Sequence, residues 1–225
     1  MKFLILTLFV TFLSLHSVAL DKLKIGVLEY PPYVSFDFKS KNIEGYLIDH
    51  AKKVFAGKYD VSFYIIPVER IADSLNSHSI DLYLTFFKSK ERNKKFSYSK
   101  EPSFIISPQI CSLRDRKTIH KTDRIIVPRS KLWKSLVSSV SDKVTTFSYS
   151  SDYMGRVIEM LKLGRADFVF LPEVFGREEE LHSIVCRPDP MFKDRTKLYL
   201  GYLKNSPLRD EIDKIWKTFK KVKTK

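Results

Sequence analysis

The chain has 225 residues, and 40 lysines and arginines against 26 acidic residues give it a formal net charge of +14 at pH 7. This length suits two modest lobes as well as one large domain. The basic residues are spread along the chain instead of gathering with aromatic residues, which argues against a nucleic-acid partner and for solvated helix faces attracted to anionic surfaces or ligands.

The first nineteen residues are typical of a secretory signal peptide. Lys2 precedes an apolar run over residues 3–15, and the small residues Ser17 and Ala19 occupy the positions that a signal peptidase reads. The run is shorter than the ~17 to 25 residues of a spanning helix. We therefore expect a soluble periplasmic protein that begins at Leu20, with an uncleaved anchor as the alternative.

Strands and helices then alternate in the order of a parallel α/β sheet. Apolar periodicity predicts strands over residues 23–28, 61–66 and 80–87, separated by helices over residues 45–55 and 68–75. Such sheets bind ligands beyond the carboxyl ends of their strands. The loop after the first strand is therefore a candidate site.

That loop reads Glu29-Tyr30-Pro31-Pro32-Tyr33. Two prolines fix φ at consecutive residues, so the loop is ordered and holds Tyr30 and Tyr33 as a rigid aromatic wall. The alternative is that the tyrosines cap the core. Glu29 is a candidate acceptor for a ligand donor, or the partner of a nearby lysine.

A second alternation follows an extended segment at residues 104–107. Gly164 is expected to end the helix over residues 152–163 as a left-handed cap. The sequence predicts strands over residues 124–127, 144–147, 168–171 and 198–203, and helices over residues 131–140, 152–163 and 208–222.

Cys111 and Cys186 are the only cysteines. In an oxidising compartment a lone pair favours a disulfide over two free thiols, and closing so long a loop is worth up to ~4.5 kcal/mol in the chain-entropy model. The histidines show no spacing suited to a metal. We expect neither a metal nor a cofactor.

Four segments, in order, resemble the bacterial extracellular solute-binding proteins of family 3, the amino-acid-binding type that serves ABC transporters. They carry the family's Tyr-Pro-Pro-aromatic loop with Gly45, Tyr46 and Asp49, its Asp81 and Arg92 signature, its Gly164 and Asp167 element, and its returning strand and closing helix. The segments are "KIGVLEYPPYV" with "IEGYLIDHAKKVF", "SIDLYLTFFKSKERNKKFSYSKEP", "MLKLGRADFVFLPE" and "LYLGYLKNSPLRDEIDKIWKTFK". The resemblance implies the type 2 periplasmic-binding fold, with a ligand cleft between two α/β lobes. It implies one lobe from residues 20–106 and 193–225, a second from residues 107–192, and hinges at residues 104–108 and 187–194.

In the first lobe, the resemblance implies that Arg92 grips a ligand carboxylate, for which a planar guanidinium is well shaped. The alternative is a surface arginine within the basic run of residues 88–95. Thr85 and Phe86 correspond to pocket contacts beside that arginine. Their alternatives are a buried threonine bonded to backbone and a core phenylalanine.

The second lobe departs from the family pattern in two places. Ser130, between Arg129 and Lys131, stands where the family has a Gly-Ser or Gly-Thr pair; it opens a helix that attracts an anion, or is only a cap. Pro172 replaces the acid that holds a ligand's ammonium, and Glu173 is either its substitute or a solvent-exposed residue. An anionic ligand therefore fits at least as well as an amino acid.

The function implied is capture of a small carboxylate-bearing polar ligand by lobe closure, without catalysis, and its delivery to an inner-membrane ABC transporter permease. We expect a monomer. Two alternatives remain: a dehydratase-like enzyme that uses Glu29 with Glu173 as paired titratable groups, and an exported sensor whose closed form signals.

Overall fold

The computed structural model describes residues 20–129, 133–134, 137–148, 153–171, 182–188 and 196–217. The predicted signal peptide, Ser130, Pro172 and Glu173 lie outside these ranges. Within them, none of the helices combines the length and the apolar character that a membrane crossing requires.

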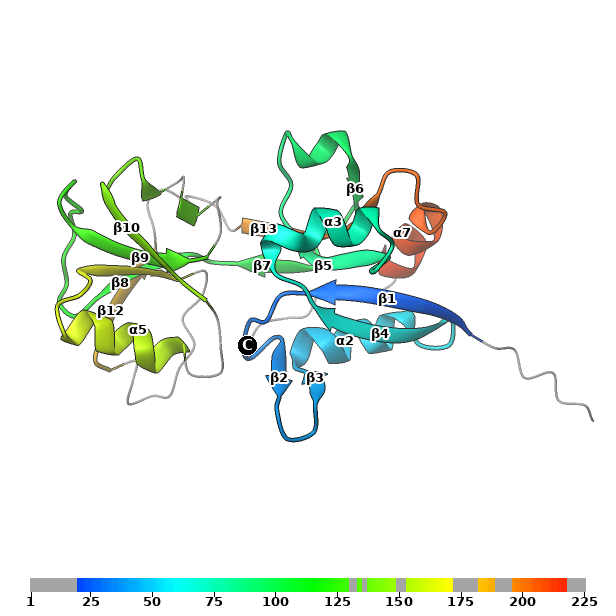
Figure 1. Cartoon of the computed structure of the whole chain (residues 1–225), viewed down its shortest axis with the longest axis horizontal. Coiled ribbons are helices and arrows are strands. Elements are labelled where there is room, and N and C mark those ends of the chain that lie inside the picture. Colours follow the sequence, from blue (N-terminus) through cyan, green and yellow to red (C-terminus); the bar gives the residue numbers. More distant parts are fainter. Residues whose placement is uncertain are drawn as a thin grey trace, which may run out of the picture.

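The first lobe is built on a six-stranded mixed sheet (Figure 1). Its path is β4 (Tyr59–Ile65), β1 (Asp21–Val27), β5 (Leu82–Phe86), β13 (Thr196–Leu203) and β6 (Phe96–Tyr98), and β7 (Phe104–Ile106) also pairs with β13. The first three strands are parallel, as predicted, whereas β13 runs antiparallel to β5, β6 and β7. A separate hairpin pairs β2 (Ser35–Asp37) with β3 (Asn42–Glu44).

Helices cover both faces of this sheet, which explains why β5 is apolar except at Thr85. On one face lie α2 (Tyr46–Phe55) and α7 (Arg209–Lys217), where the rings of Phe55 and Trp216 stack at 6.3 Å. On the other lie η2 (Val68–Arg70) and α3 (Ile71–Asn76), which packs against Tyr83 and Phe86. The five apolar residues that predicted α2 are all buried: Leu47, Ile48, Ala51, Val54 and Phe55.

The second lobe has a five-stranded sheet with α5 (Tyr153–Lys162) packed against it. The order is β10 (Lys143–Phe147), β9 (Arg124–Pro128), β11 (Phe168–Leu171), β8 (Gln109–Ser112) and β12 (Val185–Pro188). Here β9 pairs in parallel with β10 and β11, whereas β8 pairs antiparallel with β11 and β12. Within the predicted helix at residues 131–140, the described residues Trp133, Lys134 and Val137 are helical.

The two lobes lie side by side in Figure 1 and are joined through β7 and β13. The first sheet draws on residues 21–106 and 196–203, and the second on residues 109–188. The predicted hinge at residues 104–108 therefore contains β7, which pairs with the distant strand β13. The other lies mostly outside the described residues.

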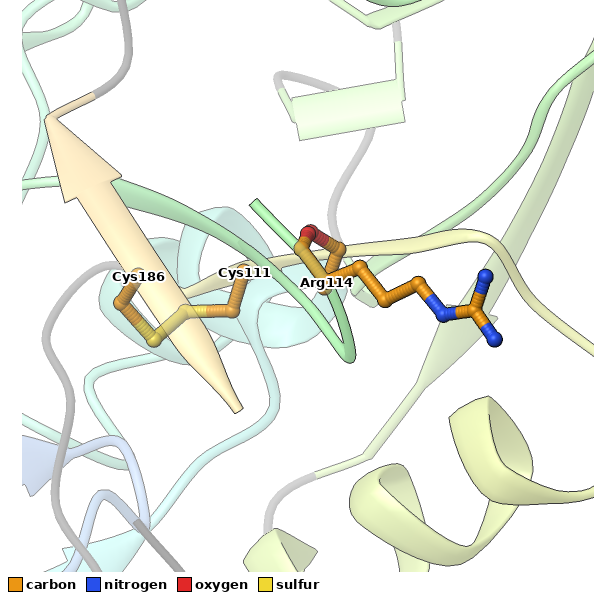
Figure 2. The surroundings of a disulfide bond; sticks show 4 residues. Cys111, Arg114 and Cys186 are labelled. Atoms are coloured by element: carbon orange, nitrogen blue, oxygen red, sulfur yellow. A yellow bond between two sulfur atoms is a disulfide. The ribbon is translucent and has the colours of Figure 1, made fainter. Parts of the chain in front are cut away.

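The predicted disulfide between Cys111 and Cys186 is present, with an S–S distance of 2.05 Å (Figure 2). The two cysteines stand directly opposite each other in the antiparallel pair of β8 and β12. Arg114, two residues beyond β8, extends its side chain away from the bond. Because β12 is the edge strand of its sheet, the disulfide ties that edge to β8.

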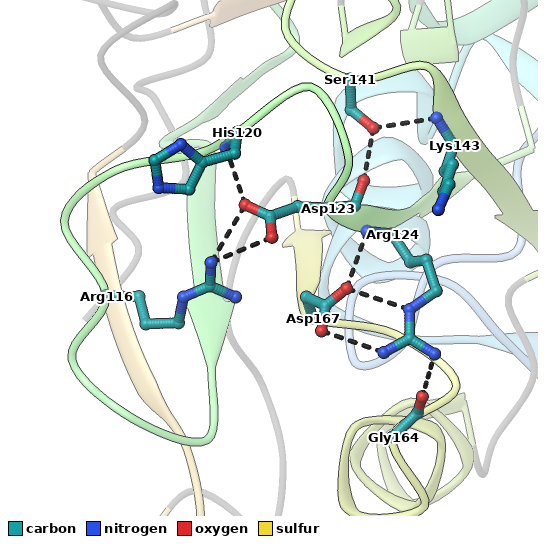
Figure 3. A network of polar contacts seen from close by, with 8 residues as sticks. All are labelled: Arg116, His120, Asp123, Arg124, Ser141, Lys143, Gly164 and Asp167. Atoms are coloured by element: carbon teal, nitrogen blue, oxygen red, sulfur yellow. Dashed lines mark hydrogen bonds and ion pairs between the residues drawn. The ribbon is translucent and has the colours of Figure 1, made fainter.

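A polar network holds the start of β9 (Figure 3). Asp167 accepts hydrogen bonds from the backbone N–H of Arg124 at 2.8 Å and from Nε and Nη2 of its guanidinium at 3.0 Å each. The same guanidinium donates to the carbonyl of Gly164, which follows α5 with φ of 63° and so confirms the predicted cap. Beside it, Nη2 of Arg116 donates to both carboxylate oxygens of Asp123, at 2.9 and 3.1 Å.

The first lobe repeats this arrangement. Asp81 and Lys24 are joined by two hydrogen bonds of 2.8 Å each. The Lys24 backbone N–H donates to the Asp81 carboxylate, and the Asp81 backbone N–H donates to the Lys24 carbonyl. Lys24 Nζ donates to the carbonyl of His78, whose φ is 56°. Asp81 and Asp167 each follow a positive-φ residue by three positions, and each ties a helix turn to the neighbouring parallel strand. We conclude that these two family-motif aspartates are structural.

Replacing Asp167 by asparagine tests this conclusion. Hydrogen bonds from Arg124 hold the pKa of Asp167 below its ordinary value. The ion pair therefore stabilises the fold fully at a pH above the ordinary pKa of an aspartate. This stabilisation is lost as the pH falls through the lowered pKa of the folded state. Because both side chains are partly exposed, the expected cost of Asp167→Asn is only about 1 kcal/mol in urea unfolding at pH 7, shrinking at acidic pH.

Asp142→Asn is the matched control. Asp142 pairs with Lys121 at 3.7 Å in an exposed position, so its loss should leave the free energy of unfolding unchanged. Equal costs for the two variants at pH 7 would contradict a special role for Asp167.

Candidate functional site

An apolar cavity of about 50 Å³ lies where the ends of β1 and β5 meet the second lobe. Residues of both predicted lobes line it, with Trp133 contributed by the second. Its walls are Leu28, Tyr30, Tyr33, Val34, Leu47, Thr85, Phe87, Ile106, Trp133 and Leu198. The carboxyl ends of the strands thus form the site that the alternation predicted.

The loop between Tyr30 and Val34 closes on itself. Tyr30 N–H donates to the Val34 carbonyl at 2.8 Å, and the Tyr30 carbonyl accepts from Tyr33 and Val34 at 2.9 and 3.0 Å; the Pro31–Pro32 bond is cis. The rings of Tyr30 and Tyr33 stack at 5.7 Å, and Phe104 meets Tyr33 edge-on at 4.3 Å. Both tyrosines are buried in the core and both line the cavity. The core interpretation and the cavity-wall interpretation of this loop are therefore compatible.

Gly45 explains why this loop and the start of α2 occur as one motif. The Leu47 N–H donates to the Tyr33 carbonyl at 3.1 Å, which brings the two backbones together. Gly45 has φ of 127°, and a Cβ there would lie 2.4 Å from the Tyr33 carbonyl oxygen. Only glycine permits this approach.

At the end of β5, Thr85 and Phe87 line the cavity, whereas Phe86 does not share their face. The register against β13 shifts between Tyr199 and Gly201. Tyr199 pairs with Phe86 and Gly201 pairs with Tyr83, so β5 advances three residues while β13 advances two. Such a bulge interrupts strict alternation. Phe86 therefore joins Tyr83 in the core below α3, with 1% exposure, and its ring packs on Gly201.

Thr85 supplies a hydroxyl to the cavity. Its Oγ1 is buried and interacts with the Tyr83 hydroxyl, which opposes the rise that burial gives the pKa of Tyr83. A ligand acceptor or a water would complete the hydrogen bonding of this threonine.

Arg92 opens the short helix η3 (Arg92–Lys94) just beyond the cavity. Its Nη1 donates to the Phe87 carbonyl at 3.2 Å, and its guanidinium lies 4.5 Å from the centre of the Phe86 ring. Burial lowers its pKa, and within the described ranges it forms no ion pair. Arg92 is thus a half-buried cation attached to a cavity residue, not an exposed arginine.

A second cation, Lys88, contacts aromatic rings near Arg92. Lys88 Nζ is 3.5 Å from the centre of the Tyr199 ring and 5.5 Å from that of Tyr98. Burial, followed by the charge of Lys197, lowers the pKa of Lys88. The segment that follows β5 therefore carries two cations that pack on aromatic rings.

Trp133 is the residue that sequence reasoning missed. Its buried ring meets Phe87 edge-on at 5.5 Å and Phe170 at 4.9 Å, so it connects the two lobes. In this segment only Ser130 was singled out from the sequence. Trp133, three residues after Ser130, was the signal that could have identified this position.

The remaining candidates are less central. Glu29 is half-buried, and burial raises its pKa while a backbone hydrogen bond from Phe36 opposes the rise. Ser130 and Glu173 lie outside the described residues, so their predicted roles stay predictions. No group of three His, Cys, Asp or Glu residues within the described ranges is arranged to hold a metal ion.

A larger depression of about 710 Å³ lies between the β2–β3 hairpin and α2. It is open to solvent and has polar walls that include Asn42, Glu44 and Asp49. All of its lining residues come from one segment of the first lobe. The smaller cavity, walled by both lobes, is therefore the better candidate site.

Comparisons with known proteins agree with this architecture. The model of the family "Bacterial extracellular solute-binding proteins, family 3" matches residues 23–224. No curated protein matches the sequence.

Solved structures with the same fold include three at low sequence identity. The arginine-bound truncated ArgBP from T. maritima has a TM-score of 0.68 and 20% identity, over 88% of this chain and 96% of that one. YtmK from Bacillus subtilis, described as a probable amino-acid ABC transporter extracellular-binding protein, has 0.65 and 22%, over 89% and 92%. The ancestral amino-acid-binding protein AncCDT-1, a precursor of cyclohexadienyl dehydratase, has 0.67 and 17%, over 88% of each chain.

Proposed function

We propose, because this chain belongs to the bacterial extracellular solute-binding proteins of family 3, that it captures a small carboxylate with an apolar body between its lobes and delivers it to an ABC importer. The observation that carries the proposal is the aromatic cavity, one of whose residues, Phe87, accepts a hydrogen bond from the half-buried guanidinium of Arg92.

The cavity walls support an apolar ligand body. Tyr30, Tyr33, Phe87 and Trp133 present ring faces and edges from both lobes, and among the described wall residues Thr85 is the only non-aromatic side chain with a polar atom. Burying apolar surface is worth about 25 cal/mol per Å². A charged or strongly polar ligand body would lose hydration there without gaining partners. An aromatic or branched aliphatic group therefore fits better than the polar ligand that the sequence suggested.

The neighbouring cations support an anionic end. The guanidinium of Arg92 keeps most of its donors for a ligand, because its one described hydrogen bond uses Nη1. A planar guanidinium can give two parallel bonds to a carboxylate. Lys88, near Tyr98 and Tyr199, adds a positive charge to the segment that follows β5.

The volume of the cavity supports a binding cycle with lobe opening. About 50 Å³ is far below the roughly 300 to 1,000 Å³ of ligand pockets, so a ligand must separate the lobes to enter. The antiparallel pair of β7 and β13 connects the lobes and is the proposed hinge. A ligand ring would then take the place of the contact between Phe87 and Trp133, and closure around it would create the form that the importer recognises.

Calorimetry with phenylpropionate and L-phenylalanine, against succinate and L-arginine, tests the proposal. The two aromatic carboxylates should bind more tightly. Arg92→Ala should weaken their binding about 100-fold, because a charge-assisted bidentate contact is lost. Trp133→Ala should weaken it about tenfold or more, because an aromatic anchor is lost.

Lys90→Ala is the matched control, since it removes an exposed positive charge from the same loop. Its affinities should equal those of the parent protein. Tighter binding of succinate or L-arginine, or an affinity for phenylpropionate that Arg92→Ala leaves unchanged, would reject the proposal.

Binding without chemistry is the role that we propose. The enzymatic alternative, in which Glu29 and Glu173 act as an acid and base pair, is tested on the same samples. Nuclear magnetic resonance spectra of each compound after long incubation should be unchanged. A new product that disappears in Glu173→Gln would favour the enzyme.

A further inference from the structure

The β2–β3 hairpin is a projecting element with an exposed aromatic tip. Its strands pair only with each other, and Figure 1 shows it extending away from the body of the first lobe. The open depression of about 710 Å³ separates it from α2. The turn reads Phe38-Lys39-Ser40-Lys41.

Local contacts hold this turn in shape. The carboxylate of Asp37 accepts hydrogen bonds from the Lys39 N–H at 2.9 Å, the Ser40 N–H at 3.3 Å and the Ser40 hydroxyl at 2.6 Å. The rings of Phe36 and Phe38 meet edge-on at 5.0 Å. The tip is therefore a formed turn that presents the Phe38 ring.

Phe38 is the most exposed large hydrophobic residue in the described part of the chain, at 77%. Lys39 and Lys41 follow it in the turn and are both exposed. Of the acidic residues on the hairpin, Asp37 lies at the turn, where its carboxylate is bonded to Ser40, and Glu44 lies at the far end of β3, away from the tip. The tip thus combines one aromatic ring with two lysines and one carboxylate, so its net charge is positive.

We propose that this tip inserts into the headgroup region of an anionic phospholipid bilayer. An aromatic ring among lysines is the combination that anchors proteins at membrane interfaces, where the ring enters the acyl boundary and the lysines meet anionic headgroups. The formal charge of +14 adds a long-range attraction to the same surface. Such a contact keeps the protein near a membrane and does not depend on the identity of its ligand.

Co-sedimentation with phosphatidylcholine vesicles containing phosphatidylglycerol tests the proposal. The parent protein should bind these vesicles and bind pure phosphatidylcholine vesicles much less. Phe38→Ser should weaken binding about tenfold, and Lys39→Gln with Lys41→Gln should weaken it by a similar factor. In Phe38→Trp, the new tryptophan fluorescence should shift to shorter wavelength when vesicles are added.

Leu163→Ser is the matched control. Leu163 is 56% exposed, follows Lys162 and lies near Arg165, yet it stands at the end of α5 and not on a projecting hairpin. Its vesicle binding should equal that of the parent protein. Parent-like binding by Phe38→Ser, equal losses in Phe38→Ser and Leu163→Ser, or no binding to anionic vesicles would each overturn the proposal. Circular dichroism of the variants checks that these surface changes leave the fold intact.

Discussion

Replacing Gly45 by alanine is expected to lower the free energy of unfolding by about 3 kcal/mol. A φ of 127° is unfavourable for a residue with a Cβ, at a cost of ~1 to 3 kcal/mol. The new Cβ would also lie 2.4 Å from the Tyr33 carbonyl oxygen and 2.8 Å from that of Pro32. Both neighbours are backbone atoms of the Tyr30–Val34 bridge, so relief requires that the whole loop move. Urea unfolding measures the loss.

The same displacement should weaken ligand binding, because it moves Tyr30 and Tyr33 in the cavity wall. Gly57→Ala is the control. Gly57 also has positive φ, 77°, but no atom lies within 4 Å of the position of its Cβ. Only the backbone cost of about 1 kcal/mol is expected there. Equal losses for the two glycines would mean that the close approach to Tyr33 is not important.

Removing the disulfide by Cys111→Ser with Cys186→Ser is expected to lower the free energy of unfolding by about 3 to 4 kcal/mol. The bond closes a segment with a sequence separation of 75, and the chain-entropy model assigns most of its effect to the unfolded state. In the folded state it also holds the edge strand β12 against β8. Thermal unfolding measured with and without a reductant gives the size of the effect.

Reduction of the parent protein should lower its melting temperature to that of the double variant, and the double variant should not respond to reductant. A parent melting temperature that is insensitive to complete reduction would contradict the prediction. The cysteines lie in the second lobe, away from the residues that line the cavity. The affinity of the refolded double variant for phenylpropionate should therefore match that of the parent.

Much of the fold was readable from local patterns. The apolar stripe of α2, the buried strands β1 and β5, and the cap at Gly164 each depend on residues a few positions apart, and the structure confirms them. The short strands β8 and β12 were not predicted. Each has four residues, and their pairing partners lie far along the chain. Because the strands are short and their partners are distant, no local sequence pattern indicated them.

The candidate site shows the same division between local and distant causes. Tyr30, Tyr33 and Thr85 were predicted and line the cavity, because their positions follow from strand ends and proline chemistry. Phe86 was placed in the core and Phe87 in the cavity because a bulge in β5 shifts the alternation by one residue. That bulge depends on β13, more than a hundred residues later. No local pattern around Phe86 contains it.

By itself, the sequence determined an alternating α/β chain with a stiff tyrosine loop at a strand end, since apolar periodicity and prolines act over short distances. Only the tertiary structure decided which aromatic rings meet between the lobes, that Trp133 is one of them, and that Arg92 is half-buried beside Phe87. The physical reason is that these contacts arise when separately formed sheets pack together, and their geometry depends on both partners at once.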